Sequence, residues 1–218
     1  PLPPDGDMAR LVQAAARQLR ISPAEIKQLD LKKRSVDARK KSDVRIIYTV
    51  DVAVKGREDK ILKMAHCPKA SIAQDYTYSV PQPAALPAQR PVIVGFGPAG
   101  MFAALVLSMA GLRPIVLERG QDAKTRHEKV LRFWQTGELD PDCNVQFGEG
   151  GAGTFSDGKL NTGVKNERIG WILEQFAEAG ASADILYDAK PHIGTDELVT
   201  VVQNLRETII HYGGEVRF

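Results

Sequence analysis

The chain has 218 residues, which suits one large domain or two modest ones. Its composition, 43% hydrophobic and 26% charged, is typical of soluble globular proteins, and its net charge of +2 indicates no general affinity for nucleic acid. There is no signal peptide and no apolar run long enough to cross a membrane, and the two cysteines, Cys67 and Cys143, form neither a disulfide framework nor a metal-ligand pattern. We therefore expect a cytoplasmic protein without a membrane span or a bound metal.

Residues 1–80 are predicted to form a small α+β domain that begins with two helical segments. Apolar residues recur at helical spacing from Met8 to Leu19, and either Asp5 or Asp7 is a suitable N-cap. Ser22-Pro-Ala-Glu25 is a capping box with proline at the first helical position, so a short helix is expected to start there.

The rest of this domain is predicted to be a β-hairpin and one more helix. Residues 44–55 alternate aliphatic or aromatic side chains with more polar ones, which is typical of a half-buried strand. A second strand over 29–36 is expected to pair with it across a turn at 37–43, and residues 58–63 suit a helix.

The turn of the predicted hairpin and the strand ends beside it carry a basic stretch: Lys32, Lys33, Arg34, Arg39, Lys40, Lys41 and Arg45. A nucleic-acid surface is one interpretation of it. Asp30 precedes this stretch, Asp37 and Asp43 lie within it, and no aromatic side chains do. A solvated turn is therefore the favoured interpretation and nucleic acid is a disfavoured partner.

Residues 81–90 lie in a proline-rich stretch that indicates an extended linker. It separates the first domain from a second one, residues 91–218. The chain begins at Pro1 without a methionine and ends at Phe218 inside a predicted strand, so we expect a piece of a longer protein whose second domain is incomplete at its C-terminus.

The second domain opens with a short apolar strand that enters a G-x-G-x-x-G turn at Gly95, Gly97 and Gly100. In a dinucleotide-binding site the first glycine permits the tight turn, the second allows the backbone to approach a pyrophosphate, and the third lets the helix pack against the strand. Pro98 and Ala99 open the following helix, whose free N–H groups and positive dipole end attract phosphates. A purely structural glycine turn is the weaker alternative.

A second strand, residues 114–117, ends at Glu118, 23 positions after Gly95. An acidic side chain in this place is expected to bind the adenosine ribose. Glu118 would repel a 2′-phosphate, so NADP is disfavoured, although the neighbouring Arg119 moderates that repulsion.

Three more helices are predicted, over residues 121–136, 167–179 and 195–211, the last with Thr195 as its cap. A third strand begins at residue 215. We expect a parallel Rossmann-type sheet with strand 91–94 in the centre and strands 114–117 and 215–218 on either side, and hence an α/β fold.

A second glycine-rich segment lies at residues 148–160. Its candidate cofactor-binding residues are Gly150, Gly151, Ala152, Gly153, Ser156 and Lys159. Successive backbone N–H groups in such a loop form anion-binding nests, so the loop is suited to close over a pyrophosphate or flank a flavin. A mobile surface loop is an equal alternative on composition alone.

The chain resembles the bacterial FAD-dependent dehydrogenases known as NAD(FAD)-utilizing dehydrogenases. The resemblance covers nearly the whole chain and rests on residues 92–104, Leu117-Glu-Arg-Gly120, residues 148–160, His192-Ile-Gly-Thr-Asp196 and Ser35-Val-Asp-Ala-Arg-Lys-Lys41. The second glycine motif is the most specific of these.

This resemblance implies a glutathione-reductase-like flavoprotein domain that binds FAD, with NAD(P)H as a candidate electron donor and no defined substrate. Members of the family are longer than this chain, and their remainder supplies the substrate region and the flavin contacts. The chain would therefore hold the adenosine and pyrophosphate half of FAD and be inactive alone. Rival interpretations are an NAD-binding enzyme without flavin and a non-catalytic nucleotide-sensing or nucleic-acid-binding protein.

No catalytic residue can be assigned, because the sequence has no credible paired carboxylates or Ser-His-Asp grouping. Cys143 could be a redox thiol, but a small buried filler is the favoured interpretation. His192 could contact substrate, but a structural role near a helix start is favoured. The sequence leaves the substrate and the oligomeric state open.

Overall fold

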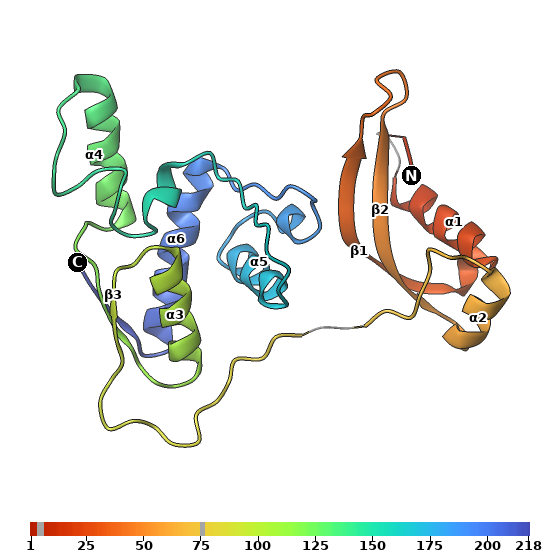
Figure 1. Ribbon diagram of the computed structural model, residues 1–218, viewed down its shortest axis with the longest axis horizontal. Helices are drawn as coiled ribbons and strands as arrows, with labels where there is room; N and C mark the ends of the chain where they lie inside the picture. Colours follow the sequence, from red (N-terminus) through yellow and green to blue (C-terminus); the bar gives the residue numbers. More distant parts are fainter. Residues whose placement is uncertain (4–6, 75–76) are drawn as a thin grey trace. The chain divides into compact units, whose positions relative to one another are not determined.

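The structure, a computed structural model, describes residues 1–3, 7–74 and 77–218 and has a mixed α/β architecture. It contains two compact units, each with its own sheet (Figure 1). Unit 1 comprises residues 1–76 and 186–190, and unit 2 comprises residues 77–185 and 191–218. Within the described residues, no helix is long and apolar enough to span a membrane.

The helices of unit 1 follow local sequence signals. Helix α1 (Met8–Leu19) begins where the Asp7 carboxylate accepts a hydrogen bond of 2.9 Å from the Arg10 N–H; the other candidate cap, Asp5, lies outside the described residues. The capping box at Ser22 is formed, and it starts the 3₁₀ helix η1 (Pro23–Glu25). Helix α2 (Glu58–Ala65) extends two residues beyond its predicted end.

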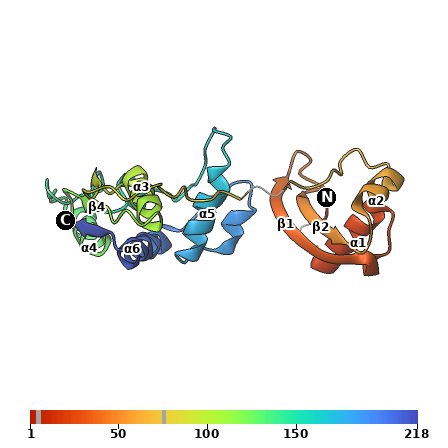
Figure 2. The same ribbon diagram turned by 90° about the horizontal axis from the view of Figure 1, so that it is seen from below.

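The sheet of unit 1 is the predicted hairpin, with a first strand that is longer than the predicted 29–36 and a second strand that is one residue shorter at each end than the predicted 44–55. Strand β1 (Ile26–Asp37) pairs antiparallel with β2 (Arg45–Val54), and Asp37 lies opposite Arg45 at the turn. Two register irregularities interrupt the pairing along β1. The two strands curve around α1 (Figure 2).

A distant segment adds to the edge of β1, which the sequence did not predict. The Arg34 N–H donates to the Tyr187 carbonyl (2.6 Å), and the Ala189 N–H donates to the Arg34 carbonyl (2.8 Å). The Arg34 guanidinium also binds both carboxylate oxygens of Asp188, at 2.6 and 2.9 Å. Because this fork is bidentate, it fixes the register of the added segment as well as its position.

Unit 2 contains a three-stranded parallel sheet whose strand order differs from the prediction. The order is β3 (Val92–Val94), β4 (Ile115–Leu117), β5 (Glu215–Arg217), so β4 and not β3 is central. The Glu118 N–H continues the β4–β5 pairing by donating to the Arg217 carbonyl (2.8 Å).

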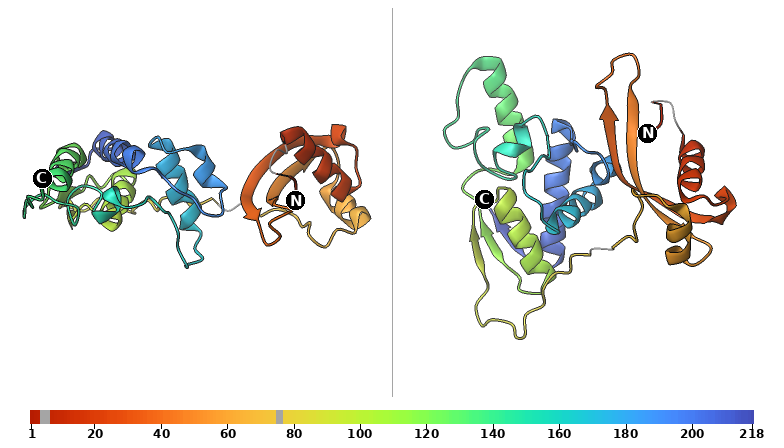
Figure 3. Two further views of the ribbon diagram at one scale, coloured as in Figure 1. Left: turned by 90° about the horizontal axis from the view of Figure 1, so that it is seen from above. Right: turned by 45° about the vertical axis from the view of Figure 1, so that its right-hand side comes forward.

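The position of the helices explains this order. Helices α3 (Pro98–Met109) and α6 (Thr195–His211) pack against each other on the same face of the sheet, as the two views of Figure 3 show. Right-handed crossovers whose helices share one face move across the sheet in one direction. Strand β5 therefore lies beyond β4; the order predicted from the sequence would require α6 on the opposite face.

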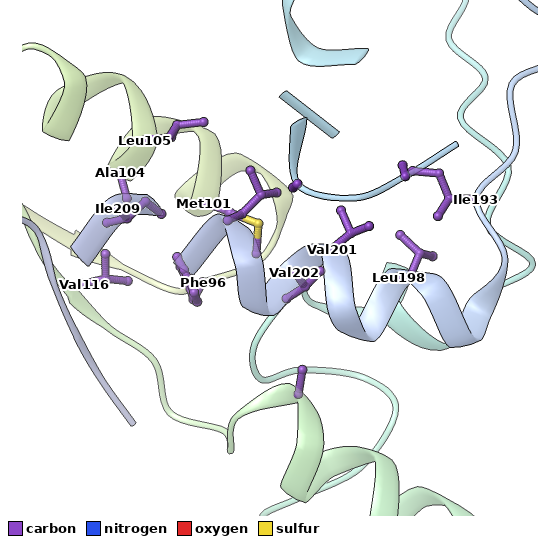
Figure 4. Packing of buried hydrophobic residues seen from close by; sticks show 14 of the residues in the cluster. Phe96, Met101, Ala104, Leu105, Val116, Ile193, Leu198, Val201, Val202 and Ile209 are labelled. Carbon is purple, nitrogen blue, oxygen red and sulfur yellow. The ribbon is translucent and has the colours of Figure 1, made fainter. Parts of the chain in front are cut away.

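The core of unit 2 forms between these two helices and the sheet. Met101 and Leu105 of α3 are buried with Val201 of α6, and Val116 supplies the central strand (Figure 4). Burial of several such side chains, each stabilising by about 1.5–3 kcal/mol, holds the end of β3 close to the start of α3.

Two further helices complete unit 2, α4 (Ala123–Thr136) and α5 (Arg168–Glu178), close to their predicted bounds. Between them the glycine-rich segment contains only the 3₁₀ helix η2 (Ala152–Phe155). A third 3₁₀ helix, η3 (Ala183–Leu186), precedes the segment that pairs with β1.

Candidate functional site

The turn between β3 and α3 has the geometry that its glycines predict. Gly95 has a φ of +96°, and its N–H donates to the Leu117 carbonyl (2.8 Å), so the first strand ends against the second. Gly97 is the N-cap of α3 and Pro98 is the first helical residue. Pro98 and Ala99 are exposed, so the start of this helix is open to solvent.

Gly100 brings the helix against the strand. A Cβ at this position would collide with the Gly95 carbonyl oxygen, and it would lie 3.0 Å from the Gly95 carbonyl carbon and 3.4 Å from Ile93 Cγ2. Because the colliding atoms belong to the backbone, a side chain could be accommodated only by moving the helix away from β3.

Glu118 points its carboxylate at the first glycine turn. One oxygen accepts from the Phe96 N–H (2.6 Å) and the other from the Gly120 N–H (2.8 Å), and the residue is only 9% exposed. A carboxylate has about four acceptor positions, so two remain after these bonds. The backbone thus holds the carboxylate in one orientation beside the start of α3.

The second glycine segment packs against the first. The Gly150 N–H donates to the Phe96 carbonyl (2.9 Å), inside the first turn. Gly151 has a φ of +66°, and a Cβ on it would lie 3.2 Å from both Gly97 Cα and Pro98 Cδ. These backbones approach so closely because Gly151 carries no side chain, whereas a Cβ on Gly97 would make only an ordinary contact, 3.9 Å from Gly151 Cα.

This packing leaves a set of backbone donors without acceptors. Within the described part of the chain, no group accepts a hydrogen bond from the N–H groups of Gly97, Ala99 or Gly100. The same holds, among the described residues, for the N–H groups of Ala152 and Gly153, both exposed at the start of η2. An anion beside α3 would satisfy donors of this kind.

Three other predicted site residues, Ser156, Lys159 and Arg119, make their contacts away from the first glycine turn. Ser156 bonds locally to the Gly153 carbonyl (2.8 Å), and the Lys159 ammonium pairs with Asp157 (2.6 Å) on the surface. The exposed Arg119 places its guanidinium over the Phe147 ring, 3.9 Å from the centroid, directly before the second glycine segment.

The predictions at the start of α6 need a correction. Thr195 was expected to be the N-cap, but Gly194 occupies that position and Thr195 is the first helical residue. Its hydroxyl therefore donates to the Ser156 carbonyl (2.9 Å) and not to the first turn of its own helix. His192 is exposed and its backbone forms an antiparallel bridge with Lys159.

Arg126, a fully buried arginine on α4, was not predicted from the sequence. Its guanidinium donates to the carbonyls of Glu149, Asn144 (3.2 Å) and Gly151 (3.1 Å). Burial lowers the pKa of this guanidinium, and the nearby thiol and carboxylates of Cys143, Glu118 and Glu149 oppose that shift. Arg126 shares a helical stripe with the buried Ala123 and Val130, and this spacing was the signal that could have revealed it.

Glu149 lies within the second glycine-rich segment, residues 148–160, and the sequence indicated no role for it. Its side chain is fully buried, and one oxygen accepts from the Ala123 N–H (2.6 Å) and from the Arg206 guanidinium (3.0 Å), while the other oxygen has no partner among the described residues. Burial raises the pKa of Glu149, and these two donors act against that shift. The carboxylate therefore joins the second glycine segment to α4 and α6.

Cys143 is almost fully buried, 2% exposed, near Arg126 and Lys129. Burial raises the pKa of its thiol, which keeps the sulfur protonated and weakly nucleophilic. The small-filler interpretation is favoured over a redox role. No group of three or more potential metal ligands is present among the residues that the structure describes.

The basic stretch of unit 1 is largely neutralised by neighbouring acids. Lys32 pairs with Asp51, Arg34 with Asp188, Arg39 with Asp37 and Arg45 with Asp43. The Arg39 guanidinium beside Asp37 lowers the pKa of that carboxyl to about 2. This hairpin therefore presents much less positive charge than its arginine and lysine content indicates.

Two comparisons with known proteins bear on the chain. Residues 1–53 match a family described as a domain of unknown function, DUF8436. An uncharacterized protein of Clostridium beijerinckii is 46% identical to the chain over 215 residues. The match covers 98% of this chain and 40% of the Clostridium protein, so the chain spans less than half the length of that relative.

Proposed function

We propose that unit 2 binds the adenosine and pyrophosphate part of FAD, and that the protein is an FAD-dependent oxidoreductase with a Rossmann-type nucleotide-binding domain. The observation that carries this proposal is the meeting of three segments at one helix start. The turn at Gly95–Gly100, the carboxylate of Glu118 and the backbone of Gly151 are adjacent, and the donors at the start of α3 have no acceptor among the described residues.

The strand order supports the same conclusion. Numbered along the chain within unit 2, the three strands are arranged 3-2-1, as in the first half of a Rossmann sheet, where the dinucleotide lies at the carboxyl ends of the strands. Glu118 directly follows the carboxyl end of β4 and the glycine turn follows that of β3. Both candidate elements therefore lie at the sheet edge where such folds bind their ligands.

The residues present fit the adenosine and pyrophosphate of FAD. A side chain at Gly151 would crowd the backbone at Gly97 and Pro98, and glycine at 97 adds no Cβ on the side where the phosphates would approach. The remaining acceptor positions of Glu118 suit the two hydroxyls of an adenosine ribose. The free N–H groups of Gly97, Ala99 and Gly100 suit phosphate oxygens.

When bound, the flavin would supply hydride-transfer chemistry, with NAD(P)H as a candidate donor. The residues of this chain would bind and orient the adenosine end, and the dipole of α3 would offset the negative charge of the phosphates. These contacts involve no proton transfer, so no catalytic residue is assigned to this chain.

The proposal can be tested by measuring ADP and FAD binding to the 218-residue chain by calorimetry. In Gly97→Ala the new methyl group would be 3.9 Å from Gly151 Cα, an ordinary contact that the fold tolerates, but it would stand where the phosphates approach. We expect at least about tenfold weaker binding of ADP, equivalent to the loss of one hydrogen bond to a charged group.

Gly163→Ala is the matched control, because its added Cβ meets no atom within 4 Å and its φ is not positive. It should bind ADP as the wild type does. Equal affinity of Gly97→Ala and Gly163→Ala for ADP, or no binding by the wild type, would contradict the proposal. Mass measurement of the nucleotide extracted from the purified protein distinguishes FAD from NAD.

A further inference from the structure

We infer that Arg126 is a positioning residue for pyrophosphate recognition: from beneath the second glycine segment, it turns carbonyl groups away from the ligand and N–H groups toward it. This inference rests on the proposed function of unit 2. It concerns a residue that does not itself reach the surface, since Arg126 is fully buried.

Two peptide units of the second glycine segment are oriented by Arg126. A trans peptide holds its C=O and its N–H on opposite sides. The Glu149 carbonyl accepts from the Arg126 guanidinium, and the N–H of the same peptide unit, on Gly150, donates to the Phe96 carbonyl in the first glycine turn (2.9 Å). The side opposite Arg126 is therefore the side of the first turn.

The next contact repeats this orientation. The Gly151 carbonyl also accepts from Arg126 (3.1 Å), so the N–H of that peptide unit, on Ala152, points away from the guanidinium. Ala152 is exposed, and within the described residues its N–H has no acceptor. Two carbonyls that would repel a phosphate are thus turned inward, and one free donor is turned outward.

The guanidinium is suited to this role because of its shape. Its planar fork carries five N–H donors, and it binds three carbonyls that belong to different residues of one irregular segment. A lysine ammonium is a point donor on a flexible stem and does not match the spacing of these three carbonyls. A Cβ on Gly148 would collide with the Arg126 side chain, so the segment packs closely against it.

Glu149 supports the segment from a second direction. Its carboxylate binds the start of α4 through the Ala123 N–H and binds α6 through Arg206. The backbone around Gly150 is therefore held on both sides, and Arg126 sets the direction of the peptide units between these anchors.

The test compares two ligands that differ only in their phosphates. NMR titration of the 218-residue chain would give dissociation constants for ADP and for adenosine. In Arg126→Lys we expect ADP binding to weaken about tenfold, the equivalent of one charge-assisted hydrogen bond, while adenosine binding changes less than about twofold. A merely structural defect would weaken both ligands equally.

Arg132→Lys is the matched control, because Arg132 lies on the same helix and its side chain is 73% exposed. It should leave both dissociation constants unchanged. An unchanged ratio of the two constants in Arg126→Lys would overturn the inference while leaving the proposed function intact, whereas a wild-type chain that binds no ADP would remove both.

A second measurement serves if Arg126→Lys fails to fold. In the ¹⁵N-labelled wild-type chain, ADP should shift the amide resonance of Ala152 and adenosine should not. An Ala152 resonance that ADP leaves in place would refute the proposed orientation of this donor, whatever the behaviour of the variant.

Discussion

The close approach of α3 to β3 makes a sharp prediction about two glycines in equivalent helical positions. Gly100 and Gly170 are each the third residue of their helix, α3 and α5 respectively. An added Cβ would collide with the Gly95 carbonyl in the first case and meet no atom within 4 Å in the second. Alanine substitution changes helix propensity equally at both sites, so the difference between the two variants reports the packing alone.

The two substitutions are expected to change the free energy of unfolding in opposite directions. Gly170→Ala should stabilise unit 2 by about 0.5–1 kcal/mol, the usual advantage of alanine over glycine in a helix. Gly100→Ala should destabilise it by about 1–3 kcal/mol, because the backbone must move to relieve the collision. With an m-value of about 2 kcal/mol/M, the urea midpoints of the two variants should differ by roughly 1–2 M.

Tryptophan fluorescence is a selective assay for this comparison. The chain has two tryptophans, Trp134 and Trp171, and both lie in unit 2. Trp171 packs edge-on against Phe102 of α3, with ring centroids 6.1 Å apart, so its emission should follow the unfolding of α3. If Gly100→Ala proved as stable as Gly170→Ala, the reasoning on the close approach of helix and strand would be refuted.

Two further predictions concern a buried acid and the added strand. Burial raises the pKa of Glu149 in the folded state, so the folded protein holds the proton more tightly than the unfolded chain. The resulting stability is fully present below the unfolded pKa of about 4.5 and is lost as pH rises through the folded pKa. Glu149→Gln should therefore flatten the plot of urea midpoint against pH in this range. Asp188→Asn should remove the bidentate, charge-assisted pair with Arg34, which contributes about 1 kcal/mol at this partly exposed position. Hydrogen exchange of the Ala189 amide, measured by NMR, should then become about fivefold faster, and exchange at the amides of β2 should not change. Unchanged exchange at Ala189 would show that the backbone pairing holds this segment by itself.

The helices could be predicted from the sequence because their signals are local. Asp7 and Ser22 cap their helices through contacts within three residues, and α6 ends at His211 as predicted. The hairpin of unit 1 was also predictable, since its alternation and turn lie within one stretch of about 30 residues.

The strand order could not be predicted in the same way. It depends on which face of the sheet α6 covers, and nearly 80 residues without a strand separate β4 from α6. The face is decided by packing, in which Val201 and Ile209 of α6 meet the apolar side of α3. Residues 187–189 illustrate the same limit, because their pairing with Arg34 joins positions 154 apart and has no local pattern.

At the candidate site, the sequence indicated the glycines and Glu118 but not the residues that hold them. The glycine pattern is visible because a backbone approach excludes every side chain, so the requirement falls on residue identity. Arg126 satisfies buried carbonyls, and an arginine on a predicted helix is ordinarily taken as exposed. Only its alignment with Ala123 and Val130 distinguished it from the other basic residues of α4.

The glycines of the second segment can be compared with what packing alone requires. Packing requires glycine at 148, 150 and 151, where φ is positive and where Arg126, Thr154 or Gly97 leaves too little space for a Cβ. The donors at Ala99, Gly100 and Ala152 have no acceptor within the described chain and lie where the two glycine segments meet. Water satisfies such donors at any exposed helix start, so the free donors by themselves do not separate a ligand site from a structural turn. The separation comes from the ADP titration, because a phosphate that replaces this water must shift the affinity in Gly97→Ala and leave it unchanged in Gly163→Ala.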